Sequence, residues 1–320
     1  MSSLFFATTT VQVEDALANG EDIEATACAS FDSRNAIVLV ESARPGGQSN
    51  NTTPLLSAIK RGLGEVVDSL LNKGANPNHR PEGRTKSPIQ MAALEGQADI
   101  LERLVKAGAD INDNQGGESD TALIIASQEG HVDVVDRLLS LGADLETKGE
   151  EGMTALMWAS QNGRIDVVDR LLAAGAKVNA LSDDNSTAVI YAASEGNLSV
   201  IDRLVVHGAD FNLQNNDEWN ALMFAATNQY PKLVERLLCL NCDINAQDNR
   251  GTTALMMSCS NGNEDIAKLL LDHEADPFFR NKNGRRAIDF AARSRDIQTL
   301  LNGLILLSFH HHHHRHHHVP

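Results

Sequence analysis

The sequence predicts an all-α solenoid of stacked helix-turn-helix units, and three observations support this fold class. A short motif of a capping residue, a small residue and an aliphatic residue recurs every 33 or 34 residues. A marker resembling Gly-Ala-Asp follows the first seven of these eight motifs about twenty residues later. Between the markers, apolar residues follow the spacing of two short helices. The first motif begins at Thr53, Ser87, Thr121, Thr154, Thr187, Asn220, Thr253 and Arg286. The second marker begins at Gly74, Gly108, Gly142, Gly175, Gly208, Asn241 and Glu274. A fixed period of this length is typical of a protein that grows by adding repeats.

Residues 150–182 show how one repeat is organised. Thr154 precedes an apolar run and can accept a hydrogen bond from the first helical turn, as an N-cap hydroxyl does. Gly163 and Gly175 interrupt the apolar pattern and supply the backbone freedom for two breaks. Neither predicted helix is long enough to be stable alone, so neighbouring repeats must stack to bury the apolar faces.

The repeats resemble the ankyrin family in period and in sequence. The stretch from Thr154 to Ala180, TALMWASQNGRIDVVDRLLAAGAKVNA, follows the family pattern closely, and the resemblance covers residues 51–303. The histidine that usually follows the capping triplet is absent. Its place is taken by Leu56, Gln90, Ile124, Met157, Ile190, Met223, Met256 and Asp289. The resemblance therefore implies that apolar packing replaces the hydrogen bond of that histidine.

The period divides the chain into four parts. Residues 1–25 resemble an N-terminal capping half repeat, with Gly20 in the glycine place. Gly20 and Gly74 are 54 residues apart, which is one period plus 21, so residues 26–50 form an inserted finger. Its run from Ala36 to Val40 favours a small hairpin. About eight repeats occupy residues 51–303, and residues 304–320 form an apolar end and a His-rich tail.

Charge and hydropathy restrict the partners. The formal net charge is −16, which disfavours nucleic acid and anionic membrane as partners and favours a basic or mixed-charge protein. No stretch approaches the roughly 20 apolar residues of a transmembrane helix. Residues 1–11 lack the basic n-region of a signal peptide. We therefore expect a monomer in the cytoplasm or the nucleus.

The sequence contains little that indicates catalysis. No zinc-protease helix, P-loop or nucleophile elbow is present. Cys242 and Cys259 replace alanines of the repeat, which favours buried reduced thiols over a metal or redox site with Cys239. We therefore expect no enzyme activity, no cofactor and no metal site.

Two alternatives from other functional classes stay open. An enzyme, or an enzyme subunit, would use the inserted finger, which contains Cys28, Asp32 and Glu41 but no histidine. A metal-binding protein would use the tail 309–320, which contains eight of the 12 histidines.

Three further columns recur at the repeat interval. Arginines on the second helices each follow an acid, which predicts a series of ion pairs at Arg103, Arg137, Arg170, Arg203 and Arg236. Large apolar residues on the first helices predict core packing between repeats, with partial exposure as the alternative, at Met91, Ile125, Trp158, Tyr191, Phe224, Met257 and Phe290. The turn asparagines resemble the substrates of asparaginyl hydroxylases, or else bond their own backbone, at Asn78, Asn112, Asn179, Asn212 and Asn245.

The ankyrin resemblance also implies where a partner binds. Members of the family bind through the hairpin tips, called fingers, and the outer ends of the first helices, called the palm. Carried onto this chain, the predicted contact residues are Glu150, Glu151, Met153, Asp183, Asp184, Asp217, Trp219, Gln161, Asn162, Glu195 and Asn228. The central tips are acidic, and basic residues lie toward both ends of the array. Trp219 is predicted to anchor the partner, and packing on the neighbouring finger is the alternative. The predicted function is a protein-interaction module (adaptor, scaffold or inhibitor) that binds a basic segment through an acidic concave face.

Overall fold

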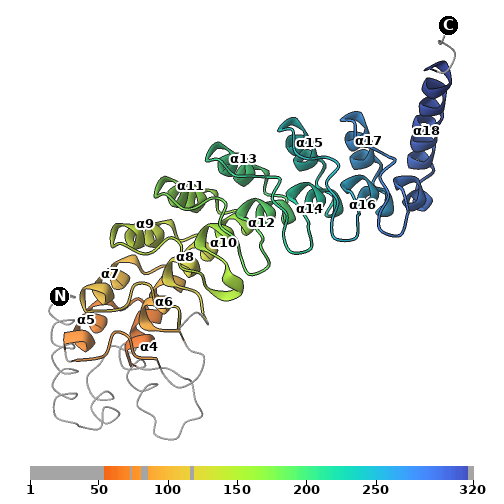
Figure 1. The fold of residues 1–320 in the computed structure, drawn as a ribbon. Coiled ribbons are helices and arrows are strands. Elements are labelled where there is room, and N and C mark those ends of the chain that lie inside the picture. Colours follow the sequence, from red (N-terminus) through yellow and green to blue (C-terminus); the bar gives the residue numbers. More distant parts are fainter. Residues whose placement is uncertain (1–53, 73, 81–85, 116–118, 316–320) are drawn as a thin grey trace, which may run out of the picture. The chain divides into compact units, whose positions relative to one another are not determined.

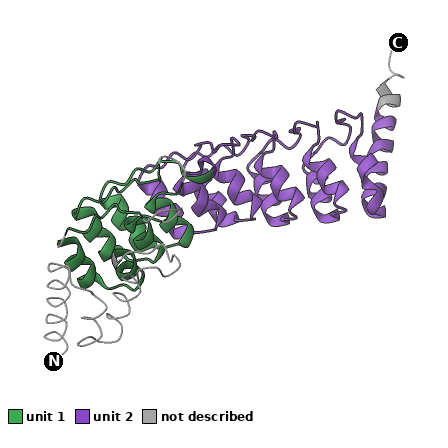
Figure 2. Ribbon diagram, turned by 90° about the horizontal axis from the view of Figure 1, so that it is seen from below, with its two compact units in different colours: residues 1–150 green, residues 151–320 purple. Residues whose placement is uncertain are grey.

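Each repeat forms a pair of short helices in the computed structural model, which describes residues 54–72, 74–80, 86–115 and 119–315 (Figure 1). The chain divides into two compact units, residues 1–150 and 151–320 (Figure 2). The described part of the first unit contains three helix pairs. They are α4 (Pro54–Lys60) with α5 (Gly64–Asn72), α6 (Pro88–Leu94) with α7 (Ala98–Lys106), and α8 (Ala122–Glu129) with α9 (Val132–Ser140).

The second unit contains five helix pairs of the same kind. They are α10 (Ala155–Gln161) with α11 (Ile165–Ala173), α12 (Ala188–Ser194) with α13 (Leu198–Val206), α14 (Ala221–Thr227) with α15 (Pro231–Cys239), α16 (Ala254–Ser260) with α17 (Glu264–Asp272), and η3 (Ala287–Arg293) with α18 (Arg295–Arg315). A short 3-10 turn, η2 (Glu150–Gly152), precedes α10. All regular elements of the described residues are helical, as the sequence predicts.

The first helices begin where the capping residues predict. The hydroxyl of Thr121 accepts from the amide of Ile124 at 3.2 Å, and that of Thr154 accepts from the amide of Met157 at 3.4 Å. The side-chain oxygen of Asn220 does the same for Met223 at 3.0 Å. These bonds satisfy one of the free amides of the first helical turn, so the recurring Thr or Asn sets the start of each helix.

The core lies between successive repeats within each unit. First helices pack on first helices and second helices on second helices, as α10, α12, α14 and α16 show in the second unit. Residues 122–127 of α8 are all buried, whereas the second helices bury one face only. A first helix therefore depends on a neighbour on each side, which is why one repeat cannot fold alone.

The turn asparagines connect neighbouring repeats instead of bonding their own backbone. The side-chain oxygen of Asn78 accepts from the amide of Asp110 at 2.8 Å, and Asn179, Asn212 and Asn245 repeat this contact one period further on. The expectation of a bond within the turn is wrong for these residues, because the free amide of the next turn lies within reach. The role of these asparagines as hydroxylation sites stays a prediction.

The arginine column forms ion pairs that cross from one repeat to the preceding one. Arg103 contacts Asp68 at 2.9 Å, and Arg236 contacts Asp202 at 2.8 Å. Arg203 lies 3.7 Å from Asp169, and Arg137 pairs with Glu102. The predicted series of ion pairs is confirmed at these positions, and water and salt screen such exposed pairs.

The C-terminal helix differs from the helices of the central repeats. The predicted half repeat 1–25 and the inserted finger 26–50 lie outside the described residues, as do residues 316–320. Helix α18 continues through the apolar end to Arg315, and it leaves Leu306, Leu307 and Phe309 exposed at 64%, 60% and 64%. No helix among the described residues is long and apolar enough to span a bilayer.

Candidate protein-interaction site

The finger tips of the second unit are closed five-residue loops. They comprise residues 182–186, 215–219, 248–252 and 281–285. In the second tip, the amide of Asn215 donates to the carbonyl of Trp219 at 2.9 Å. The Asn215 side-chain oxygen accepts from the amides of Asp217 and Trp219, each at 3.0 Å. Asp248 and Asn281 close their loops in the same way. Each tip therefore satisfies its own backbone and holds one shape.

Main-chain hydrogen bonds join these tips into a row. The carbonyl of Glu151 accepts from the amide of Asp183 at 3.0 Å, and that of Asp184 accepts from the amide of Asn216 at 2.8 Å. The same contact joins Asp217 to Asn249 at 3.1 Å and Arg250 to Lys282 at 2.9 Å. The side chains on the tips thus keep a repeating spacing within this unit.

The sign of the charge changes along this finger row. Its first part carries the exposed side chains of Glu151, Asp183, Asp184, Asp217 and Glu218, and its last part carries those of Arg250, Lys282 and Arg285. Among the described residues, none of these acids forms an ion pair with a basic side chain. The row therefore presents unneutralised carboxylates to solvent, followed by unneutralised cations.

A short hydrogen-bond network connects the finger tip 182–186 to helix α12. The Tyr191 hydroxyl on α12 donates to Ser182 Oγ at 2.9 Å, and Ser182 Oγ donates to Asp184 at 2.6 Å. Burial alone would raise the pKa of Asp184, but hydrogen bonds from Ser182 and Ser186 outweigh it, so this pKa lies below 3.8. The Asp184 carboxylate is therefore charged at neutral pH and fixed in direction.

The predicted palm residues of the second unit lie on the ends of α10, α12 and α14. Asn162, Glu195 and Asn228 are exposed, and Gln161 is half-buried. The Asn228 amide donates to the carbonyl of Ser194 at 2.9 Å, so this side chain also holds two first helices together. Glu195 adds a carboxylate to the acidic part of the unit.

Trp219 contacts both the next finger and the first helix that follows it. Its indole Nε1 donates to the buried Asp248 of the next finger at 3.1 Å. Its ring lies edge-on to Phe224, with 4.9 Å between ring centroids. The side chain is half-buried, so the structure shows the local packing that was the alternative. Its role as an anchor for a partner stays a prediction.

Met153 does not lie on the surface, and its assignment as a contact residue is wrong. Its side chain is 1% exposed and belongs to the core. Met153 directly precedes the capping Thr154, and an apolar residue in this place packs inward against the first helix as a hydrophobic staple. The position of Trp219 before Asn220, with Phe224 five residues on, is the same arrangement.

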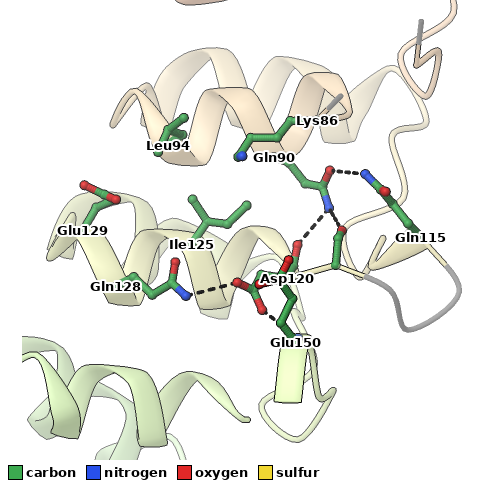
Figure 3. A pocket seen from close by; sticks show the side chains of 10 residues that line it. Lys86, Gln90, Leu94, Gln115, Asp120, Ile125, Gln128, Glu129 and Glu150 are labelled. Atoms are coloured by element: carbon green, nitrogen blue, oxygen red, sulfur yellow. Dashed lines mark hydrogen bonds between the residues drawn. The ribbon is translucent and has the colours of Figure 1, made fainter. Parts of the chain in front are cut away.

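Glu150 borders an open pocket in the first unit (Figure 3). The pocket has a volume of about 580 Å³ and lies between α6, α8 and the finger that precedes α8. Asp120 lies at its centre. One of its oxygens accepts from the amide of Glu150 at 3.0 Å, and the other accepts from the Gln128 side chain at 3.1 Å. Burial raises the pKa of Asp120 above 3.8, and these hydrogen bonds oppose the rise.

Gln90 lies in the wall of this pocket. Its contacts show that the expectation of apolar packing in place of the absent histidine is wrong at this position. It stands in the place of the absent histidine and is 1% exposed, yet it is not held by apolar packing alone. Its Nε2 donates to the carbonyls of Asp113 and Asp120 at 3.2 and 2.8 Å and to Ser119 Oγ at 2.9 Å. Its Oε1 accepts from the Gln115 side chain at 3.3 Å. Gln90 therefore ties together both legs of the finger, as Figure 3 shows.

Two of the three described cysteines have the surroundings of structural residues, and the third, Cys239, is exposed. Cys259 is buried and Cys242 is half-buried, and burial raises the pKa of each thiol to about 12. Both thiols therefore stay protonated at neutral pH and are poor nucleophiles and ligands. Within the described residues, no three His, Cys, Asp or Glu side chains are grouped closely enough to hold a metal ion.

Stacked helix pairs with exposed, closed fingers define a helical-repeat scaffold. The chain matches the family model described as "Ankyrin repeats (3 copies)" over residues 16–115, 89–182, 174–248 and 232–307. It therefore belongs to the ankyrin-repeat family, whose repeats mediate protein–protein interaction and are typically non-catalytic. Among solved structures, the ankyrin repeat domain of human ASB11 is similar at a TM-score of 0.61 and 26% identity, over 68% of this chain and 96% of that one. No curated protein sequence matches the chain.

Sequence reasoning missed the residues that shape the fingers. Ser182, Asn215, Asp248 and Asn281 recur at 33-residue intervals, and each can accept a hydrogen bond. That recurrence was the available signal for the closed tips. For the pocket, the signal was the single glutamine in the histidine place, at Gln90.

Proposed function

We propose that the chain is a non-catalytic binding module, acting as an adaptor, scaffold or inhibitor, whose partner presents a basic segment to the acidic fingers. The observation that carries this proposal is the row of exposed carboxylates at Glu151, Asp183, Asp184 and Asp217, which stand on tips whose main chains are bonded to one another. A preformed main chain loses little conformational freedom on binding, and charges of one sign steer an oppositely charged partner. We further propose that the chain acts as a monomer in the cytoplasm.

The change of sign along the row supports a partner with two kinds of charge. A basic segment would lie over the tips from Glu151 to Glu218, and an acidic segment would lie over Arg250, Lys282 and Arg285. Binding in the reversed direction would place like charges together, which costs several kcal/mol. The row would therefore select both the composition and the direction of the partner segment.

The test is affinity capture with three versions of the full chain, read by quantitative mass spectrometry. The tip variant combines Glu151→Gln, Asp183→Asn and Asp217→Asn. The control variant combines Asp166→Asn, Glu235→Gln and Asp265→Asn, which removes the same charge from exposed positions on the second helices. We expect a protein with a basic segment that is retained by the wild type and the control and lost by the tip variant. Equal capture by all three versions would refute the proposal.

A further inference from the structure

The lining of the pocket in the first unit combines apolar and charged side chains. Leu94 and the buried Ile125 supply the apolar part. The charged part consists of three carboxylates, from Asp120, Glu129 and Glu150, and one ammonium, from Lys86. The lining therefore has a formal charge of −2, from three negative groups and one positive group. A ligand that fits this lining has an apolar stem and a cationic end.

We propose that this pocket binds one arginine side chain of the partner protein. The inference rests on the proposed function, since it assumes that a protein partner exists, and it specifies a contact that the finger row does not supply. The three methylenes of an arginine would lie on Leu94 and Ile125, and its guanidinium would bridge Asp120 and Glu150.

The geometry of Asp120 favours a planar cation with several donors. A carboxylate can accept about four hydrogen bonds, and Asp120 receives one from the Glu150 amide and one from Gln128. A guanidinium carries five donors in a fixed fork and can bond two carboxylates together. Asp120 is half-buried, so its charge is partly removed from water, and a paired cation offsets that cost.

Lysine and a metal ion fit the pocket less well. A lysine ammonium is a compact and strongly hydrated charge, whereas a guanidinium is weakly hydrated and packs flat against apolar surface. The carboxylates come from the finger before α8, from the end of α8 and from the following finger. They are not among any group of side chains close enough to hold a metal within the described residues.

The pocket wall is fixed before any ligand arrives. Gln90 ties both legs of the finger through its four side-chain contacts to Asp113, Gln115, Ser119 and Asp120. A Cβ added at Gly149 would lie 2.2 Å from the Asp120 carboxylate and 2.9 Å from its Cα, so the next finger approaches Asp120 as closely as a glycine allows. A preformed site binds more tightly than one that must be ordered.

The test uses the full chain and Nα-acetyl-L-arginine amide as the probe. The protein carries ¹³C-labelled isoleucine methyl groups, and the shift of the Ile125 methyl is followed during the titration. We expect a saturable shift with half-saturation at roughly millimolar concentration, the range for a ligand of about fifteen non-hydrogen atoms. The neutral analogue Nα-acetyl-L-citrulline amide should bind at least about tenfold more weakly, because it lacks the charge that strengthens the hydrogen bonds.

Two variants assign the site. Asp120→Asn keeps the volume and one acceptor for the Glu150 amide, and it should weaken arginine binding about tenfold. Asp133→Asn removes the same charge from an exposed position on α9 and should leave binding unchanged. The absence of a saturable Ile125 shift, equal binding of citrulline, or an unaffected Asp120→Asn variant would each overturn the proposal.

The outcome is separable from that of the proposed function, because the probe requires no partner. If the tip variant loses the captured protein while the probe does not bind, the proposed function stands and the arginine pocket fails. If the probe binds while capture is the same for all versions, the pocket stands without the proposed role of the acidic fingers.

Discussion

At the scale of single residues, Trp219 shows how a side chain that resembles a binding anchor can serve the scaffold. Its Nε1 is one of three donors to the Asp248 carboxylate, together with the amides of Arg250 and Thr252. Asp248 is buried, so the loss of one donor leaves part of a charge without compensation.

We therefore expect Trp219→Phe to lower the free energy of unfolding by about 1–2 kcal/mol while the ring contact with Phe224 persists. Trp158→Phe is the matched control, because the Trp158 Nε1 is buried without a partner among the described residues and no hydrogen bond is lost. Thermal unfolding of both variants measures the difference. An equal shift in the two would show that the bond to Asp248 contributes nothing.

Asp120 gives the stability of the first unit a pH dependence. Its pKa is raised mainly by burial and further by the nearby Glu150 carboxylate, while the hydrogen bonds and Lys86 oppose the rise. The folded state then holds the proton more tightly than the unfolded state. The stability that this group contributes is present below pH 3.8 and is lost as the pH rises through the folded pKa.

The side chain introduced by Asp120→Asn carries no charge at any pH. The free energy of unfolding of this variant, relative to that of the wild type, should therefore increase as the pH is raised from 4 to 7. Urea unfolding of both proteins at the two pH values measures this change. If the variant instead lost stability relative to the wild type as the pH was raised, the pKa of Asp120 would be lowered in the folded state.

At the scale of elements, the finger tips require a left-handed residue at their fourth position. This place is taken by Asn185, Glu218, Gly251 and Gly284, with φ of 61°, 59°, 76° and 75°. A glutamate pays a steric cost there that glycine avoids, whereas asparagine tolerates this conformation better.

We expect Glu218→Gly to raise the free energy of unfolding by up to about 1 kcal/mol, and Asn185→Gly to raise it by less. Thermal melting of both variants provides the comparison. If Asn185→Gly gave the larger gain, the strain at Glu218 would be relieved by its contacts in the finger.

The elements also show what the sequence could and could not predict. The helix pairs and their starts were predictable, because the Thr caps and the apolar spacing act within a few residues. The direction of Met153 was not predicted, because a residue beside a cap can face solvent or pack as a staple. The pocket was not predicted, because Gln90 contacts residues more than twenty positions away, and a periodic pattern averages out such single exceptions.

At the scale of the whole molecule, the chain has a net charge of −16, and its charges are unevenly distributed. In the second unit, the first part of the finger row is acidic and the last part is basic. Exposed charges act over about 8–10 Å at physiological ionic strength and over longer distances at low salt. Salt should therefore affect the rate of partner association more than the fold itself.

With the captured partner in hand, we expect the association rate of the wild type to fall about tenfold between low and 0.3 M salt. The tip variant should show a much smaller dependence, and the control variant should behave like the wild type. Surface plasmon resonance at several salt concentrations measures these slopes. Parallel slopes for wild type and tip variant would assign the steering to charges elsewhere.

The finger row should also affect the resistance of the protein to proteolysis. Exposed loop tips are where chains are usually nicked, and Arg250 and Lys282 are residues that trypsin recognises. Here the main chain of each tip is bonded within its own loop and to its neighbour, so it cannot straighten into a protease cleft without first opening. These exposed tips should thus be among the slowest sites of the second unit to be cut.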